Sequence, residues 1–196
     1  MKLYHVTMVS FVDDILKEGL VLDGIDNVGG VPDSMYDFIQ QVLPTRGNYT
    51  FLWPNLDMAE RYAEEVAFDN PDFAYAVLEV DRSKIPCPCH TAPIEISSKI
   101  YDKMEPYTIY DVKDIPKEAF ELLNRLGDEY QSYVKLLNEE DVVRDDVEIF
   151  CPCAIPGSAI TLTKDLFYAP KELWRGEYYK WGSDIEQVRL GLQEGD

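Results

Sequence analysis

The sequence predicts a single α+β domain over residues 1–196, with short strands and helices inserted unevenly between them. Two observations predict it. First, 46% of the 196 residues are hydrophobic and 12% are aromatic, which is enough to build a packed core. Second, β-branched and aromatic runs alternate irregularly with helical periodicities, which is typical of α+β proteins and not of regular βαβ arrays. Internal repeats and low-complexity linkers are absent from the sequence.

The first half of the chain contains three predicted strands and three predicted helices. Strands are indicated by short β-branched and aromatic runs, and helices by apolar residues recurring every three or four positions. The first helix ends at Gly19, because glycine is a common stop signal. The predicted strands are 3–8, 49–53 and 74–80, and the other predicted helices are 34–42 and 58–67. The stretch 23–47 carries four glycines and two prolines, so outside the predicted helix 34–42 we expect mainly loop there.

The second half is predicted to hold two helices and two strands. Amphipathic periodicity predicts helices over 117–126 and 129–137, which Gly127 interrupts. Apolar runs predict strands over 147–151 and 159–163. From Lys171 onward the chain is rich in tryptophan, tyrosine and charged residues, which is compatible with a last helix or an interaction arm.

Charge limits the possible partners. The chain has 18 Lys+Arg against 37 Asp+Glu, a formal net charge of −19 and a pI near 4.3. General binding to duplex DNA and anchoring by a polybasic surface are disfavoured, although a local basic pocket remains compatible with the total. A signal-peptide core and a run of 18 apolar residues are both missing from the sequence. We therefore expect a cytoplasmic protein with no membrane partner.

Four cysteines form two Cys-Pro-Cys pairs, Cys87/Cys89 and Cys151/Cys153. In a chain of this size without an export signal they are predicted to be thiols and not disulfides. Together with His90 they offer a possible four-ligand metal site, but zinc sites favour wider cysteine spacing. We therefore expect small buried hydrophobic residues and no metal. A Cys89 nucleophile is disfavoured, because neighbours on a strand point to opposite faces.

One acidic residue, Glu148, interrupts an otherwise apolar predicted strand, so its side chain is expected to face a cleft or solvent. In a cleft it can bind a sugar hydroxyl and stabilise positive charge developing on the ring. Tyr49, Phe51 and Tyr62 would then supply faces for a flat heteroaromatic ring. Taken singly, such residues have plainer interpretations: a solvated acid, packed aromatics and, for His5, an imidazole at the edge of the core. Glycine-rich phosphate loops and G-x-S-x-G elbows are absent.

Three segments, in this order, resemble the His-Tyr-Glu type of the ADP-ribosyltransferase superfamily. The first is 3–7 (LYHVT) with a later Gly-Leu at 19–20, and the second is 49–53 (YTFLW) with Tyr62 eleven residues after the phenylalanine. The third, 148–156 (EIFCPCAIP), is most similar to the DarT-type branch. The resemblance spans most of the chain and implies an ADP-ribosyltransferase-like fold, with short strands in two packed sheets and inserted helices.

The resemblance also implies that NAD is the substrate and that Glu148, Tyr62 and His5 are catalytic. Glu148 would bind the ribose 2′-hydroxyl and stabilise the oxocarbenium-like state as nicotinamide leaves. His5 would hydrogen-bond the ribose, and Tyr62 would sandwich nicotinamide with Phe51 or Tyr49. The full set implied to bind NAD is His5, Val6, Thr7, Arg46, Tyr49, Phe51 and Tyr62. In that set the Val6 backbone binds the carboxamide, Thr7 assists through its hydroxyl, and Arg46 contacts the pyrophosphate.

These inferences predict a mono-ADP-ribosyltransferase that releases nicotinamide and modifies a macromolecular acceptor. The acidic composition favours a protein acceptor over DNA. Two alternatives remain open: a non-catalytic acidic inhibitor or binding protein with the same fold, and an NAD glycohydrolase without an acceptor. The related RNA 2′-phosphotransferases are disfavoured, because they normally use a second histidine and a basic surface.

Overall fold

A computed structural model describes most of the chain up to Phe167, namely residues 1–22, 32–43, 49–108, 110–141 and 144–167. Helices and two antiparallel sheets make up the described residues, so the α+β prediction is confirmed. One sheet has the strand order β1–β3–β7, and the other has the order β2–β6–β4–β5. Short 3-10 turns at 9–11, 82–84, 105–107, 112–114 and 157–159 connect the elements.

The chain folds into two compact units, each assembled from separate segments. Unit 1 contains Met1–Gly19, Asn55–Lys84 and the described part from Pro156 onward. Unit 2 contains Leu20–Pro54 and Ile85–Ile155. The expectation of a single domain over 1–196 stays a prediction.

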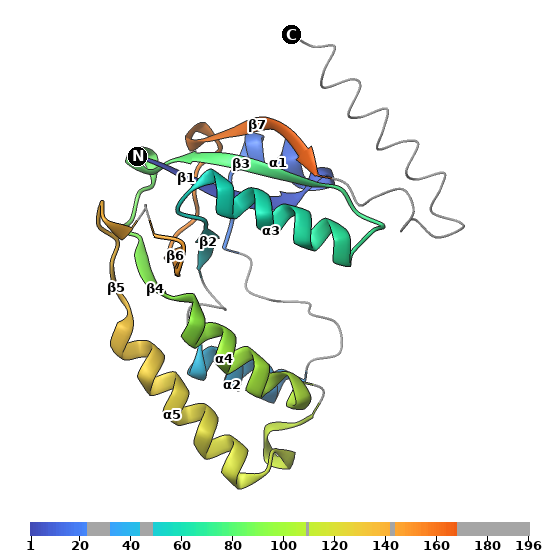
Figure 1. Cartoon of the computed structure of the whole chain (residues 1–196), viewed down its shortest axis with the longest axis vertical. Helices are drawn as coiled ribbons and strands as arrows, with labels where there is room; N and C mark the ends of the chain where they lie inside the picture. Colours follow the sequence, from blue (N-terminus) through green and yellow to red (C-terminus); the bar gives the residue numbers. More distant parts are fainter. Residues whose placement is uncertain (23–31, 44–48, 109, 142–143, 168–196) are drawn as a thin grey trace. The chain divides into compact units, whose positions relative to one another are not determined.

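Unit 1 is a three-stranded sheet with two helices, whose bounds are β1 (Lys2–Met8), α1 (Val12–Glu18), α3 (Leu56–Asp69), β3 (Tyr75–Asp81) and β7 (Ile160–Phe167). The central strand β3 is antiparallel to both neighbours. Helix α3 runs along this sheet and contacts all three strands (Figure 1). Ala59, Ala63 and Ala67 are fully or almost fully buried at i, i+4 spacing, and such small side chains allow the helix to approach the strands closely.

Helix α1 ends where the sequence predicts. Gly19 has a φ of 98°, a backbone conformation that side chains other than glycine rarely adopt. Its N–H donates to the carbonyl oxygen of Ile15 at 2.8 Å, which closes the last turn.

Several acidic side chains lie near Glu60 on helix α3 and affect the pKa of its carboxyl group. Burial, together with the carboxylates of Asp165, Asp57 and Glu64, raises the pKa of Glu60 above 4.5. Because the fold favours the protonated form, the resulting destabilisation is absent below about pH 4.5 and grows as the pH rises through the raised pKa.

We expect Glu60→Gln to raise the free energy of unfolding by about 0.5 kcal/mol at pH 7, the usual scale of like-charge pairs on a helix. Urea unfolding at pH 7 and at pH 4 measures the difference. The gain should vanish at the lower pH, and an equal gain at both would contradict the electrostatic cause.

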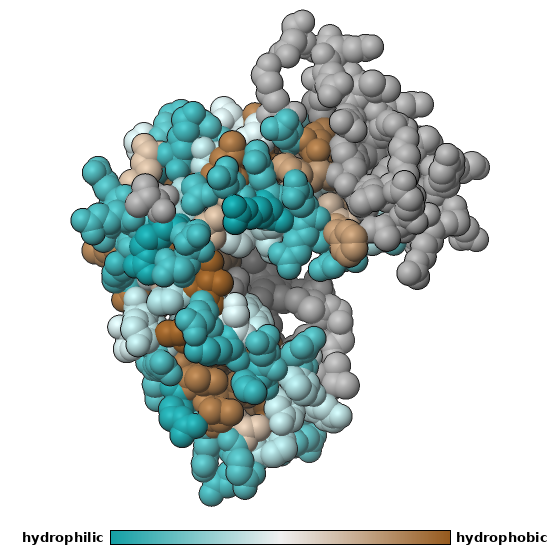
Figure 2. All heavy atoms as spheres, viewed as in Figure 1, coloured by the Kyte–Doolittle hydropathy of each residue, from teal (hydrophilic) through white to brown (hydrophobic). Residues whose placement is uncertain are grey.

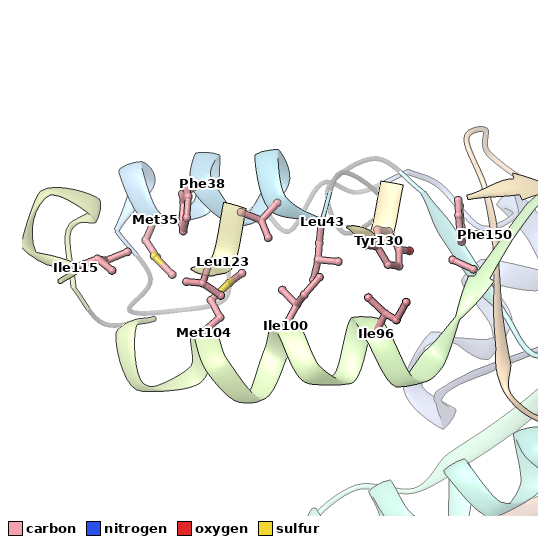
Figure 3. Close-up of a cluster of buried hydrophobic side chains, with 12 residues drawn as sticks. Met35, Phe38, Leu43, Ile96, Ile100, Met104, Ile115, Leu123, Tyr130 and Phe150 are labelled. Carbon is pink, nitrogen blue, oxygen red and sulfur yellow. The ribbon is translucent and has the colours of Figure 1, made fainter. Parts of the chain in front are cut away.

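Unit 2 is a four-stranded sheet with three helices. Their bounds are α2 (Asp33–Val42), β2 (Thr50–Leu52), β4 (His90–Pro93), α4 (Ile94–Met104), α5 (Lys117–Tyr133), β5 (Lys135–Leu136) and β6 (Val147–Cys151). The three helices enclose a buried apolar core, drawn in Figure 3. Tyr130 and Phe150 lie at the end of this core nearest the strands, and Ile115 lies at the opposite end.

The predicted break at Gly127 is wrong, because α5 continues through it as one helix. Gly127 is buried where α5 meets α2. A Cβ atom on Gly127 would lie 2.9 Å from the carbonyl oxygen of Val42 and 3.1 Å from its Cα. The close approach of the two helices therefore explains why residue 127 is a glycine. Judged from its sequence neighbours alone, the same glycine resembles a helix stop signal.

We expect Gly127→Ala to lower the free energy of unfolding by about 1–3 kcal/mol, because overpacking against a backbone atom outweighs the helix propensity of alanine. Chemical denaturation measures the change. Gln131→Ala, an exposed substitution on the same helix, is the matched control and should change stability by less than about 0.5 kcal/mol. A stabilised Gly127→Ala variant would show that the two helices can separate at no cost.

The four cysteines form two disulfides that join the first Cys-Pro-Cys motif to the second: Cys87–Cys153 and Cys89–Cys151. The prediction of thiols is therefore wrong. Strand register is the reason, because β4 and β6 are antiparallel with His90 opposite Phe150. Continuing that register outward places each cysteine of one motif opposite a cysteine of the other.

The predicted strands 3–8, 49–53, 74–80, 147–151 and 159–163 are confirmed with shifts of their ends. The predicted helix 129–137 is wrong at its end, because α5 stops at Tyr133 and Lys135–Leu136 form strand β5. Strands β4 and β5 and helix α4 were not predicted. The segment from Lys171 onward and residues 23–31 lie outside the described residues. Within the part that the structure describes, no helix has the length and apolar character needed to cross a lipid bilayer.

Candidate functional site

One face of the unit 2 sheet gathers several of the residues singled out by sequence. Phe51 on β2 lies opposite Phe150 on β6, and Glu148 lies two residues before Phe150 on the same strand. Because side chains alternate along a strand, all three belong to the same face. We call this surface the Glu148 face; Tyr49 and His90 complete it through ring contacts with Phe150.

Aromatic rings surround Phe150 on the Glu148 face. The Tyr49 ring meets it edge-on with centroids 5.4 Å apart, and the Phe51 ring is tilted at 6.2 Å. The His90 imidazole stacks on it at 5.9 Å with an interplanar angle of 14°. Tyr49 and Phe51 remain half-buried, so each keeps part of its surface accessible.

Glu148 is buried, with 7% of its surface exposed. The hydroxyl of Tyr130, itself fully buried on α5, donates to Glu148 Oε1 at 2.7 Å. A solvated acid is therefore excluded as the explanation of Glu148. Burying a carboxylate is costly unless it is hydrogen-bonded, and Tyr130 supplies one such bond while fixing the orientation of the carboxyl group.

We expect Tyr130→Phe to lower the free energy of unfolding by about 1.5–3 kcal/mol, because it removes a buried hydrogen bond to a carboxylate while keeping the ring. Thermal and urea unfolding measure the loss. Tyr133→Phe, which changes an exposed tyrosine on the same helix, is the control and should be close to neutral. Equal stability of Tyr130→Phe and wild type would show that the bond makes no net contribution.

The other predicted residues lie in unit 1. His5, Val6 and Thr7 are half-buried on β1, and Tyr62 is 40% exposed on α3. The two elements are in contact, so the structure brings the helix of Tyr62 against the strand of His5. Burial raises the pKa of the Tyr75 hydroxyl on β3, and the nearby Tyr62 adds to the effect.

The predicted site residues thus fall into two groups. One contains His5, Val6, Thr7 and Tyr62, and the other contains Tyr49, Phe51 and Glu148. Arg46 lies outside the described residues. That the two groups line one cleft stays a prediction.

Three residues that lie on the Glu148 face or contact it are not predicted as site residues from the sequence: Tyr130, His90 and Phe150. The helical spacing of Tyr130 from Leu123 marks it as buried, but its bond to a strand 18 residues later has no local signal. From the sequence, His90 is expected only as a possible metal ligand or as a partner for a thiol. Its Nδ1 is buried without a hydrogen-bond partner among the described residues.

A separate pocket of about 430 Å³ opens beside β4 and β5, and none of the predicted site residues that the structure describes lines it. Lys135 and Arg144 line it, but both are already paired. Lys135 contacts Asp141 at 2.9 Å, and Arg144 binds both oxygens of Asp146 at 2.7 and 2.6 Å. The Arg144 contact also holds the pKa of Asp146 below its usual value. Charge in this pocket is therefore balanced locally, which gives it no preference for an anion.

With the disulfides formed, no group of three or more His, Cys, Asp and Glu side chains is placed to hold a metal ion in the described ranges of the chain. Cys89 is buried and bonded to Cys151, so it is not a free nucleophile in this form.

Comparison of the chain with models of protein families, with curated proteins and with solved structures finds no match.

Proposed function

We propose that the protein is a mono-ADP-ribosyltransferase that transfers ADP-ribose from NAD to a macromolecular acceptor and releases nicotinamide. The proposal includes the ADP-ribosyltransferase-like fold as the finer description of the α+β architecture. The observation that carries it is the buried carboxylate of Glu148, which Tyr130 holds on the same sheet face as the rings of Tyr49 and Phe51.

Glu148 supplies the chemistry the reaction requires. The bond between ribose C1′ and the nicotinamide nitrogen breaks, and positive charge spreads over C1′ and the ring oxygen. A fixed carboxylate in a site with little water stabilises that charge more strongly than one in solvent. Because Tyr130 already orients the carboxyl group, little reorganisation is needed when the charge develops.

The aromatic residues fit the other half of the substrate. Nicotinamide in NAD is a flat cationic ring, which ring faces such as those of Tyr49 and Phe51 attract through stacking and cation–π interaction. Phe51 replaces the tyrosine that is usual at this position in the family it resembles, so the stacking face remains and the hydroxyl is lost.

The elements on which the motif residues lie also support the proposal. His5 is on the first strand, Tyr62 is on the helix that follows β2, and Glu148 is on a later strand. Strand, helix and strand are the elements that the resemblance implies for these residues. In the proposed reaction a nucleophilic atom of the acceptor bonds to C1′, and the proton that it loses passes to solvent.

The charge of the chain favours a protein acceptor. Hydrophilic residues predominate over the described surface on the face drawn in Figure 2, in keeping with the acidic composition. A net charge of −19 repels nucleic acid phosphates at long range, whereas a basic or neutral protein meets no such barrier.

An acceptor screen tests the proposal. Wild-type protein is incubated with NAD labelled in its adenylate moiety, in the presence of separated protein and nucleic acid fractions of a cell lysate. We expect label to enter the protein fraction, and mass spectrometry then locates the modified side chain. Label in nucleic acid alone would overturn the assigned acceptor, and free ADP-ribose alone would identify a glycohydrolase.

A further inference from the structure

The two Cys-Pro-Cys motifs bring all four cysteines of the chain to one place on the unit 2 sheet. Cα atoms of Cys89 and Cys151 are 4.4 Å apart, and those of Cys87 and Cys153 are 6.2 Å apart. Cys151 is the last residue of β6 and Cys89 directly precedes β4, while Cys87 and Cys153 lie two residues further out in each segment. Because the two disulfides join the same two short segments, all four sulfur atoms form one cluster at this end of the β4–β6 pair.

The hydrogen-bonded ladder between β4 and β6 ends at this cluster. In the β4–β6 register the even-numbered residues of β4 occupy hydrogen-bonded positions, as the bond from Ile94 N–H to the Asp146 carbonyl shows. The next such pair beyond His90 and Phe150 is Pro88 with Pro152. Neither proline has an N–H, so the ladder cannot continue there. At the proline pair the two Cys-Pro-Cys segments are therefore joined by the disulfides on either side and not by backbone hydrogen bonds.

Two disulfides are redundant as cross-links. Their sequence separations are 66 and 62 residues, and one loop lies inside the other. Once either bond has formed, the second closes only a small ring and removes little further chain entropy. The stability gained from cross-linking therefore does not explain why the chain has a second pair of cysteines. Binding of a tetrahedral metal ion explains it, because such an ion requires four ligands.

We infer that in the reduced protein Cys87, Cys89, Cys151 and Cys153 form a tetrahedral zinc site. Zinc binds four thiolates at about 2.3 Å, which puts neighbouring sulfur atoms about 3.8 Å apart. Rotation about χ1 at each cysteine can move its sulfur atom toward a shared ion, while the paired residues His90–Pro93 and Val147–Phe150 stay in register. Soft thiolate ligands in this geometry select zinc over hard cations.

Reduction of the two disulfides precedes metal binding. A dithiol reductant gives two electrons and two protons to each disulfide, which becomes two thiols while the reductant becomes a disulfide. Zn²⁺ then displaces four protons and is bound by four thiolates. The buried inner pair, Cys89 and Cys151, excludes water, whereas the half-buried outer pair, Cys87 and Cys153, gives the ion an entry path. This inference does not depend on NAD chemistry.

Cobalt(II) and alkylation test the site. Wild-type protein reduced with a phosphine is titrated with Co²⁺, and we expect one ion per chain, with the thiolate charge-transfer band and visible bands of a tetrahedral site. The oxidised protein is the control and should show none of these bands. With Zn²⁺ bound, all four cysteines should resist iodoacetamide, as counted by mass spectrometry. Protection of only two cysteines would overturn the four-sulfur site, and so would the absence of a thiolate band.

A paired variant separates the site from unspecific binding by thiols. Cys87→Ser with Cys153→Ser leaves the inner pair in place and removes two ligands. Zinc affinity, measured by chelator competition on the reduced proteins, should fall by more than about 100-fold. Loss of a residue that only supports a ligand costs up to about 100-fold, so a larger loss indicates that the ligands themselves were removed. Equal affinity of the variant and wild type would overturn the inference even if both bind zinc.

Discussion

Glu148→Gln is expected to reduce the rate of nicotinamide release from NAD at saturation by at least about 100-fold, the scale on which a single group stabilising transition-state charge contributes. The amide keeps the shape of the side chain and an oxygen that accepts from the Tyr130 hydroxyl. The negative charge is lost and the second oxygen becomes an NH2 group, so we expect the main effect on kcat and a small one on the fold.

Circular dichroism and urea unfolding establish that the variant is folded. Removal of a buried charge that keeps its hydrogen bond should leave the free energy of unfolding equal to that of the wild type or higher. Glu95→Gln is the matched control, because its carboxylate is in the same unit and is largely exposed. Wild-type turnover by Glu148→Gln would remove this residue from the proposed mechanism.

Removal of all four cysteine sulfur atoms is expected to lower the free energy of unfolding by about 4 kcal/mol, the value for a single cross-link closing a loop of this length. Because the two loops nest, Cys87→Ser with Cys153→Ser alone should cost less than about 1 kcal/mol. Replacing the buried inner pair with alanine alone should also cost much less than the fourfold change.

Urea unfolding in the presence of a metal chelator measures this series under oxidising conditions. The chelator keeps zinc from compensating for a lost disulfide. The informative quantity is the difference between the fourfold variant and the sum of the two pairs. Additive losses, with each pair costing about half of the total, would contradict the nested-loop account and restore a separate structural role for each disulfide.

Local patterns in the sequence predicted the elements that depend on local interactions. Strand β1 and the end of α1 at Gly19 follow from residue type and periodicity alone. The same local rule failed at Gly127, because that glycine exists to accommodate the backbone of Val42 from a distant helix. Nothing within α5 distinguishes a glycine that ends a helix from one that allows close packing.

Long-range partners account for the rest of what the sequence did not predict. The disulfides depend on the register between β4 and β6. Because strand β4 was not predicted, that register could not be predicted either. For the candidate site, the pattern predicted that Glu148 matters because a charge interrupts an apolar strand. It did not predict Tyr130 as the residue that holds it, since the two are on different elements.

The most direct test of the account is a single-turnover reaction with NAD labelled in nicotinamide and protein in molar excess, followed by chromatography of the quenched mixture. We expect wild-type protein to release labelled nicotinamide, with faster release when the acceptor is added. Glu148→Gln run beside it should leave the NAD largely intact. NAD recovered unchanged from folded wild-type protein, with and without acceptor, would contradict the proposed activity.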